Sequence, residues 1–151
     1  MLRQAIGQVW TRSRAMSSKI HYVKPEKIDP AQTFRHGVSK EVAQEFPPLV
    51  QTVLSLENAC RMDINKAQIA KAVEAFQRFP GDTGSSEVQI AVLTQKISYL
   101  TEHMQQHKKD KHSMRGLVGL VNKRRKLLKY LKRKDVQKCK AVVSALGIRF
   151  K

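Results

Sequence analysis

Hydrophobic residues recur at spacings of three and four along most of the chain after residue 60, which is the period of a helix that buries one face. One helix is predicted to begin at Asp63 or Asn65 and to end near Phe79, where Pro80-Gly81 stops it. A second helix is predicted to begin with Ser85 as its cap. The inward faces are Ile69, Val73 and Phe76 in the first helix, and Ile90, Leu93, Ile97, Leu100 and Met104 in the second.

The same pattern predicts two further helices. Ser113 is expected to cap the third, and Asp135 to begin the fourth, which Gly147 ends. No segment alternates with a period of two, so we expect an all-α fold, a small bundle of three or four helices. The expected inward residues are Leu117, Leu120, Val121, Leu127, Leu128 and Leu131 in the third helix, and Val136, Cys139, Val143 and Leu146 in the fourth.

The chain before residue 61 is less regular. Four prolines interrupt it between residues 25 and 48, and each disfavours a helical conformation in the residue before it. Short helices are predicted from Ser39 to Phe46, with Ser39 as the cap, and from Leu49 to Leu56. We interpret residues 25–60 as an irregular extension that packs on a partner or acts as a linker, and residues 61–151 as the helical domain.

Residues 1–25 carry five basic side chains and no acid. Leu2, Ile6, Val9 and Trp10 fall at helical spacing beside the basic residues. An amphipathic, Arg-bearing, acid-poor segment is typical of an organelle transit peptide, which we assign to residues 1–24. A disordered basic arm that binds RNA is the alternative. The longest stretch without a charged residue runs from Phe46 to Leu56, too short to span a membrane.

Basic residues dominate the chain, with 29 Lys and Arg against 12 Asp and Glu and a formal net charge of +17. Residues 108–140 hold fourteen Lys or Arg but only Asp110 and Asp135 as acids. An unbalanced cluster of this kind favours contact with a polyanion over a merely solvated helix face. Binding to calmodulin or to a membrane surface is the main rival, but the apolar face of this helix is needed for the bundle.

Two loops place short polar side chains at helix starts, around residues 81–89 and 107–113. Double-stranded RNA displays 2′-hydroxyls and base edges across a shallow minor groove, which short donors and acceptors can reach. Local capping of the helices is the alternative, and on the residues alone it is the favoured interpretation. The side chains concerned are Thr83, Ser85, Gln89, His103, Asp110 and Ser113.

No catalytic pattern is found. His103 and His107 lie four apart, but Glu102 precedes His103, whereas the zinc protease motif needs a Glu directly after its first His. Cys60 and Cys139 lack a CxxC spacing, which argues against a structural zinc site or a disulfide framework. We therefore expect no enzyme, no metal, no cofactor and no small-molecule substrate.

The motifs from Gly81 onward resemble the bacterial-type family of small ribosomal subunit protein 15. The resemblance covers nearly half of the chain, and its motifs occur in order. They are Asp82-Thr83-Gly84-Ser85, Glu87-Val88-Gln89, Leu100-Thr101-Glu102-His103, His107-Lys108-Lys109-Asp110, His112-Ser113, Arg115-Gly116-Leu117, Lys123-Arg124-Arg125-Lys126-Leu127-Leu128, Tyr130-Leu131-Lys132, Lys134-Asp135-Val136 and Leu146-Gly147.

This resemblance implies a four-helix protein with a three-helix core and a mobile first helix, which binds small-subunit ribosomal RNA (rRNA) during assembly. It implies contact with a three-way RNA junction through Thr83, Gly84, Gln89, Tyr130 and Arg133. It also implies contact with a minor groove through His103, Asp110 and Ser113. Other small-subunit proteins and a bridge to the large subunit are further expected partners. His107, Arg115 and Arg124, which lie in the matching motifs, complete the expected RNA-binding set.

Three positions depart from the family pattern. Lys111 stands where a histidine is usual, Met114 replaces an arginine, and Ser86 stands where proline often opens the helix. Loss of the arginine removes one phosphate contact. The resemblance together with the transit-like N-terminus favours a mitochondrial ribosome. A plastid or bacterial ribosomal protein of the same family, or a basic helical RNA-binding module outside the ribosome, are the alternatives.

Overall fold

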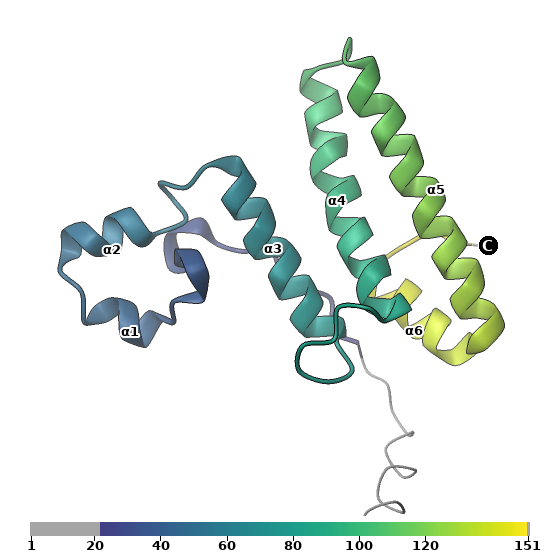
Figure 1. Cartoon of the computed structure of the whole chain (residues 1–151), viewed down its shortest axis with the longest axis horizontal. Coiled ribbons are helices and arrows are strands. Elements are labelled where there is room, and N and C mark those ends of the chain that lie inside the picture. The colour runs from purple at the N-terminus through teal and green to yellow at the C-terminus, as the bar shows by residue number, and fades with distance from the viewer. Residues whose placement is uncertain (1–21, 151) are drawn as a thin grey trace, which may run out of the picture.

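The computed structural model describes residues 22–150, and their architecture is all-α (Figure 1). Within these residues, the only β-type pairing is an isolated bridge between Phe34 and Ser55. In chain order the elements are the 3-10 turns η2 (Pro30–Gln32) and η3 (Arg35–Gly37), then α1 (Lys40–Gln44), α2 (Pro48–Leu54), α3 (Arg61–Phe76), α4 (Ser86–Gln106), α5 (Lys111–Lys134) and α6 (Val136–Leu146). The all-α prediction is confirmed.

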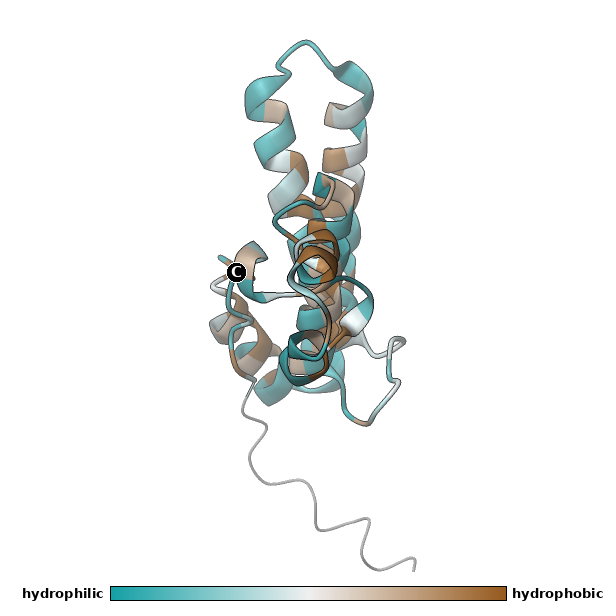
Figure 2. Ribbon diagram, turned by 90° about the vertical axis from the view of Figure 1, so that its left-hand side faces the viewer, coloured by the Kyte–Doolittle hydropathy of each residue, from teal (hydrophilic) through white to brown (hydrophobic). Residues whose placement is uncertain are grey.

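The last four helices, α3 to α6, pack on one another. α4 and α5 run antiparallel as a long hairpin, α3 packs on the side of α4 that faces away from α5, and α6 folds back at the base of the hairpin (Figure 1). The half of the hairpin near residues 107–113 projects beyond α3 and α6, and its turn is hydrophilic (Figure 2). The two loops singled out in the sequence therefore lie at opposite ends of the hairpin, residues 81–89 at its base and residues 107–113 at its tip.

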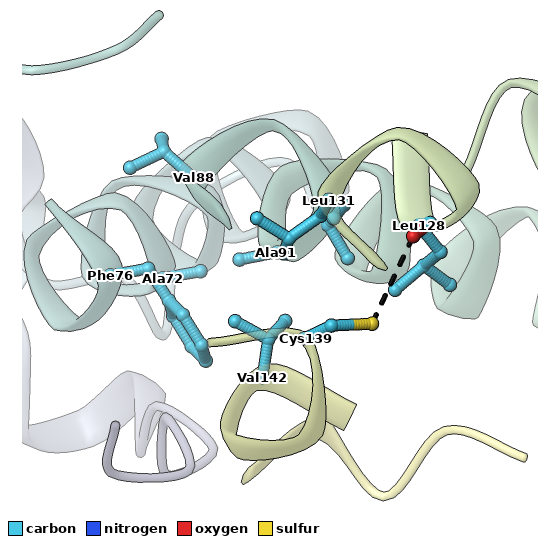
Figure 3. Packing of buried hydrophobic residues seen from close by; sticks show 9 residues of the cluster. Ala72, Phe76, Val88, Ala91, Leu128, Leu131, Cys139 and Val142 are labelled. Atoms are coloured by element: carbon cyan, nitrogen blue, oxygen red, sulfur yellow. Dashed lines mark hydrogen bonds between the residues drawn. The ribbon is translucent and has the colours of Figure 1, made fainter. Parts of the chain in front are cut away.

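The core lies where all four helices meet (Figure 3). Phe76 of α3 and Val142 of α6 are fully buried, and the Cys139 thiol donates to the backbone oxygen of Leu128 across 3.8 Å. Packing of this kind fixes the base of the hairpin, next to the loop between α3 and α4. The buried cluster is Ala72, Phe76, Val88, Ile90, Ala91, Leu128, Leu131, Cys139 and Val142.

Two helix starts agree with the prediction. The Ser39 side chain accepts the N–H of Val42 at the start of α1, and the Asp135 side chain accepts the N–H of Lys138 at the start of α6. Gly147 ends α6 in the left-handed region, with φ of 62°. This conformation is readily adopted by glycine, as expected for a helix stop.

Other helix boundaries differ from the prediction. α3 begins at Arg61, before Asp63, and ends at Phe76 rather than near Phe79. Ser113 does not cap α5, because Asp110 occupies that position and its carboxylate accepts the N–H of Ser113. Ser85 stands at the cap position of α4 but makes no side-chain cap bond.

Two residues predicted to point inward are exposed. Val121 is 40% exposed and Val136 is 49% exposed, whereas Val142, which was not predicted, is fully buried. Val121 lies near the middle of α5, whose buried residues, Leu128 and Leu131, are nearer its C-terminal end. Val136 is the first residue of α6, at the turn where α5 has already ended.

The extension is more ordered than predicted. Tyr22 stacks on Phe76 with ring centroids 5.0 Å apart, and the N–H of Leu56 donates to the oxygen of Thr33 across 2.9 Å. Ala43 and Leu56 are buried, so α1 and α2 belong to a folded unit beside α3. The expected transit peptide lies almost wholly outside the described residues. In the structure, α3 packs on the core through Phe76. The mobility expected of this helix stays a prediction.

Candidate nucleic-acid interface

The loop between α3 and α4 is held in shape by the buried carboxylate of Asp82. Its Oδ1 accepts the N–H groups of Gly84 and Ser85, each across 3.1 Å, and its Oδ2 accepts the N–H of Arg78 across 3.3 Å. Gly81 makes the turn with φ of 85°, in the region that favours glycine. These bonds satisfy the backbone within the loop, so Thr83 and Gly84 are left exposed at its tip.

A hollow of about 520 Å³ lies beside this loop, between the starts of α4 and α6 and the end of α5. It brings together Gly84, Gln89 and Tyr130, three residues predicted to bind RNA from distant parts of the chain. Lys134 lies over the Tyr130 ring, 5.8 Å from its centroid. The residues that line it are Arg78, Gly84, Ser85, Ser86, Gln89, Leu127, Tyr130, Leu131, Lys134, Asp135 and Lys138.

The chemistry of this hollow suits a polyanion with exposed bases. Arg78, Lys134 and Lys138 outnumber Asp135, which is the single acid of its lining. Tyr130 is 44% exposed and offers an aromatic face for stacking. The Ser85 hydroxyl is itself buried within this lining.

Glu87 is the main structural residue that the sequence prediction missed. Its carboxylate is fully buried and receives two bonds from the Arg78 guanidinium, at 2.7 and 2.8 Å. Burial alone raises the pKa of Glu87, but hydrogen bonds from Arg78, from its own backbone and from Ser86 outweigh it. The pKa of Glu87 therefore lies below its ordinary value, and the pair ties the end of α3 to the start of α4. A fully buried position of this kind is usually occupied by an apolar residue. The only sequence signal for the ion pair was therefore Arg78, nine residues before Glu87.

At the hairpin tip the structure brings His103, Asp110 and Ser113 together, as the resemblance implies. Asp110 accepts the Ser113 N–H across 3.0 Å, the Ser113 hydroxyl across 2.6 Å and His103 Nε2 across 3.1 Å. Bonds from the Ser113 hydroxyl and N–H, and then from His103, hold the pKa of Asp110 well below its usual range. An ionised carboxylate has about four acceptor positions, so roughly one remains for an outside donor.

The other predicted site residues differ in accessibility. His107 lies beside His103, with ring centroids 4.6 Å apart. Arg115 and Arg133 are exposed on α5, but Arg124 is half-buried and donates to the Thr94 hydroxyl across 3.3 Å. Burial lowers the pKa of Arg124. Arg124 is thus held partly in the contact between α4 and α5, while Arg115 and Arg133 are free to meet solvent or a ligand.

Comparison with known proteins agrees with the geometry. A model of the family described as "Ribosomal protein S15" matches residues 69–149, just over half of the chain. The chain belongs to the ribosomal protein S15 family. Two curated relatives are both named small ribosomal subunit protein uS15. The one from Halorhodospira halophila is 54% identical over 88 residues, which are 58% of this chain and 99% of the relative. The one from Bdellovibrio bacteriovorus is 57% identical over 88 residues, with the same coverage of each chain.

Membership of the family fixes the broad role. The protein has a structural role in the ribosome and is not an enzyme, and the family implies rRNA and ribosomal proteins as partners. The family match begins at residue 69, so the extension with α1 and α2 lies outside it. Among the described residues, no helix is long and apolar enough to cross a membrane, and no three potential metal ligands gather.

Proposed function

We propose that the protein binds small-subunit rRNA at two places, a three-way junction at the base of the hairpin and a minor groove at its tip. The hollow that joins Gly84, Gln89 and Tyr130 is the observation that carries this proposal. Thr83 and Arg133, which adjoin the lining residues Gly84 and Lys134 in the chain, extend the junction contact. His103, Asp110 and Ser113 form the minor-groove contact, with His107, Arg115 and Arg124 as supporting contacts.

The compartment that we propose is the mitochondrial matrix, within the mitochondrial ribosome. Support comes from the acid-free, Arg-bearing residues 1–25, together with a family match whose two named relatives are bacterial. A plastid ribosome is the second candidate, because plastid transit segments share the same composition. The bridge to the large subunit is also a proposal, placed near the basic tip of the hairpin.

Binding at the hollow is tested with a small-subunit rRNA fragment that contains a three-way junction. Tyr130→Ala is expected to weaken binding by about 1–3 kcal/mol, since an aromatic stacking surface is lost. Gln137→Ala, an exposed change on α6, is the control and leaves the affinity unchanged. Equal affinity of the Tyr130 variant and the wild-type protein at matched salt would contradict the junction assignment.

The compartment is tested separately. Residues 1–30 fused to a fluorescent reporter are expected to direct it to mitochondria. Mass spectrometry of purified mitochondrial small subunits is expected to detect the chain with a shortened N-terminus. A diffuse cytosolic reporter argues against a targeting segment, and a plastid signal selects the second candidate.

A further inference from the structure

The short helices α1 and α2 expose an unusual number of large hydrophobic side chains. We call Val42, Phe46, Leu49, Val50 and Val53 the extension patch. Their exposed fractions are 46%, 39%, 77%, 36% and 60%, respectively. No residue of α2 is buried, although five of its seven residues are apolar. Several large exposed apolar side chains on one short segment are typical of an interaction site.

The extension patch is preformed. Leu49 and Val53 of α2 have the spacing of four that places side chains on one helix face, whereas Val42 lies on α1 and Phe46 lies between the two helices. The Gln51 side chain donates to the oxygen of Phe46 across 2.8 Å, and the Thr52 hydroxyl donates to that of Pro48 across 2.9 Å. Because these bonds already fix the backbone, a partner would not have to order it.

The extension is also anchored to the rest of the protein. Arg35 donates to the oxygen of Asn58 across 2.7 Å, and Leu56 and Ala43 are buried. Ile28 and Leu56, together with residues of η3 and α3, line a common cavity between the extension and α3. Leu56 and Ala43 already fill the inward positions of this unit, so the hydrophobic side chains of the extension patch are not needed for its core.

The net charge of residues 39–58 argues against RNA as the ligand of the extension patch. Residues 39–58 contain one Lys, at position 40, against Glu41, Glu45 and Glu57. The whole chain carries +17, so this segment has the opposite sign to the rest of the protein. Phosphates are disfavoured at this segment, because its three Glu outnumber its one Lys. Charge complementarity instead favours a partner protein whose binding surface has an apolar centre surrounded by basic side chains.

We infer that the extension patch docks into an apolar groove with a basic rim on a neighbouring protein of the small subunit. This inference rests on the proposed place in a ribosome. α1 and α2 lie beyond α3, on the opposite side from α5, and hydrophobic ribbon is prominent when the molecule is seen from that side (Figures 1 and 2). The chain therefore binds RNA with α4 and α5 while it holds a protein with the extension.

The test uses the full chain, incorporated into small subunits in cells, with the photo-crosslinking residue p-benzoylphenylalanine at position 49. The matched control carries it at Gln44, which is exposed on the face of α1 away from Val42 and Phe46. Position 49 is expected to crosslink to a ribosomal protein, at a peptide that holds apolar residues flanked by Lys or Arg. A crosslink to rRNA, to a second copy of this chain or to no macromolecule overturns the inference.

A second measurement separates this inference from the proposed function. The double variant Leu49→Gln with Val53→Gln removes both exposed anchors without touching the core. Crosslinking from position 46 to the same partner is expected to fall roughly tenfold, because a few apolar anchors dominate such interfaces. Affinity for the rRNA junction fragment is expected to stay at the wild-type value. Unchanged crosslinking contradicts the docking inference, whereas lost RNA binding by Tyr130→Ala bears only on the RNA site.

Discussion

The carboxylates of Asp82, which is buried, and Asp110, which is partly exposed, organise the two loops. Asp82 satisfies three backbone N–H groups, and Asp110 caps α5 while it orients Ser113 and His103. On the sequence alone, capping competed with RNA recognition as the explanation of these loops. In the structure, the capping bonds also hold the residues that we propose for RNA recognition, so capping and the proposed recognition are compatible in one arrangement.

The Glu87 carboxylate is expected to contribute to stability more than any surface pair. Glu87→Gln removes the charge that the Arg78 guanidinium meets, and we expect it to lower the free energy of unfolding by about 1–3 kcal/mol. The expected loss of stability is limited because the Arg78 side chain is half exposed, so water solvates its charge when the partner is neutral. Glu102→Gln breaks an exposed pair with Arg61 and is the control, with an expected loss below about 1 kcal/mol. Urea unfolding of both variants measures the difference.

The pH dependence of this difference has a defined sign. The pKa of Glu87 is lower in the folded protein than its ordinary value of 4.5, so the stability it contributes is complete above about pH 4.5. This contribution is lost as the pH falls through the folded pKa. The free-energy gap between wild-type protein and Glu87→Gln is therefore expected to narrow below pH 4.5. A gap that stays constant down to pH 3 would show that the pair does not stabilise the ionised form.

At the scale of elements, the sequence predicted what local rules determine. Ser39, Asp135 and Gly147 were identified because caps and helix stops depend on a few neighbouring residues. Val121 was assigned to the core wrongly, because the pattern of a helix cannot reveal where its neighbours end. The gathering of Gly84, Gln89 and Tyr130 likewise depends on tertiary packing. Gln89 was singled out by its side-chain chemistry and all three by the family resemblance, but the hollow that joins them was not predictable.

Alanine substitution is expected to change the stability of the protein in opposite directions at two glycines, one that follows the end of α6 and one inside α5. Gly147 has φ of 62°, and Gly147→Ala is expected to destabilise the protein by about 1 kcal/mol. Gly116 lies inside α5, and nothing stands within 4 Å of a β-carbon added there. Gly116→Ala is therefore expected to stabilise the free protein by about 0.5–1 kcal/mol. Thermal unfolding followed by circular dichroism tests both, and equal signs would contradict the assigned backbone roles.

At the scale of the whole molecule, charge separates two surfaces. α5 contains no acid between Lys111 and Lys134, whereas the segment of α1 and α2 is acidic and apolar. The family match covers the strongly basic C-terminal half of the chain and stops short of the acidic segment at residues 39–58. A division of this kind lets the same protein hold RNA on one side and a protein on the other without competition between the two ligands.

The salt dependence of RNA binding is expected to report which half meets phosphate. Each phosphate contact releases about one counterion, so Lys129→Ala or Arg133→Ala is expected to reduce the slope of log affinity against log salt by roughly one. Both side chains are exposed on α5. Lys40→Ala is the matched control, because Lys40 belongs to the acidic extension and bonds to Gln32, and it leaves the slope unchanged. A Lys40 variant that flattens the slope as much as Arg133→Ala would place phosphate on the extension, and would contradict both the charge division and the docking surface inferred from it.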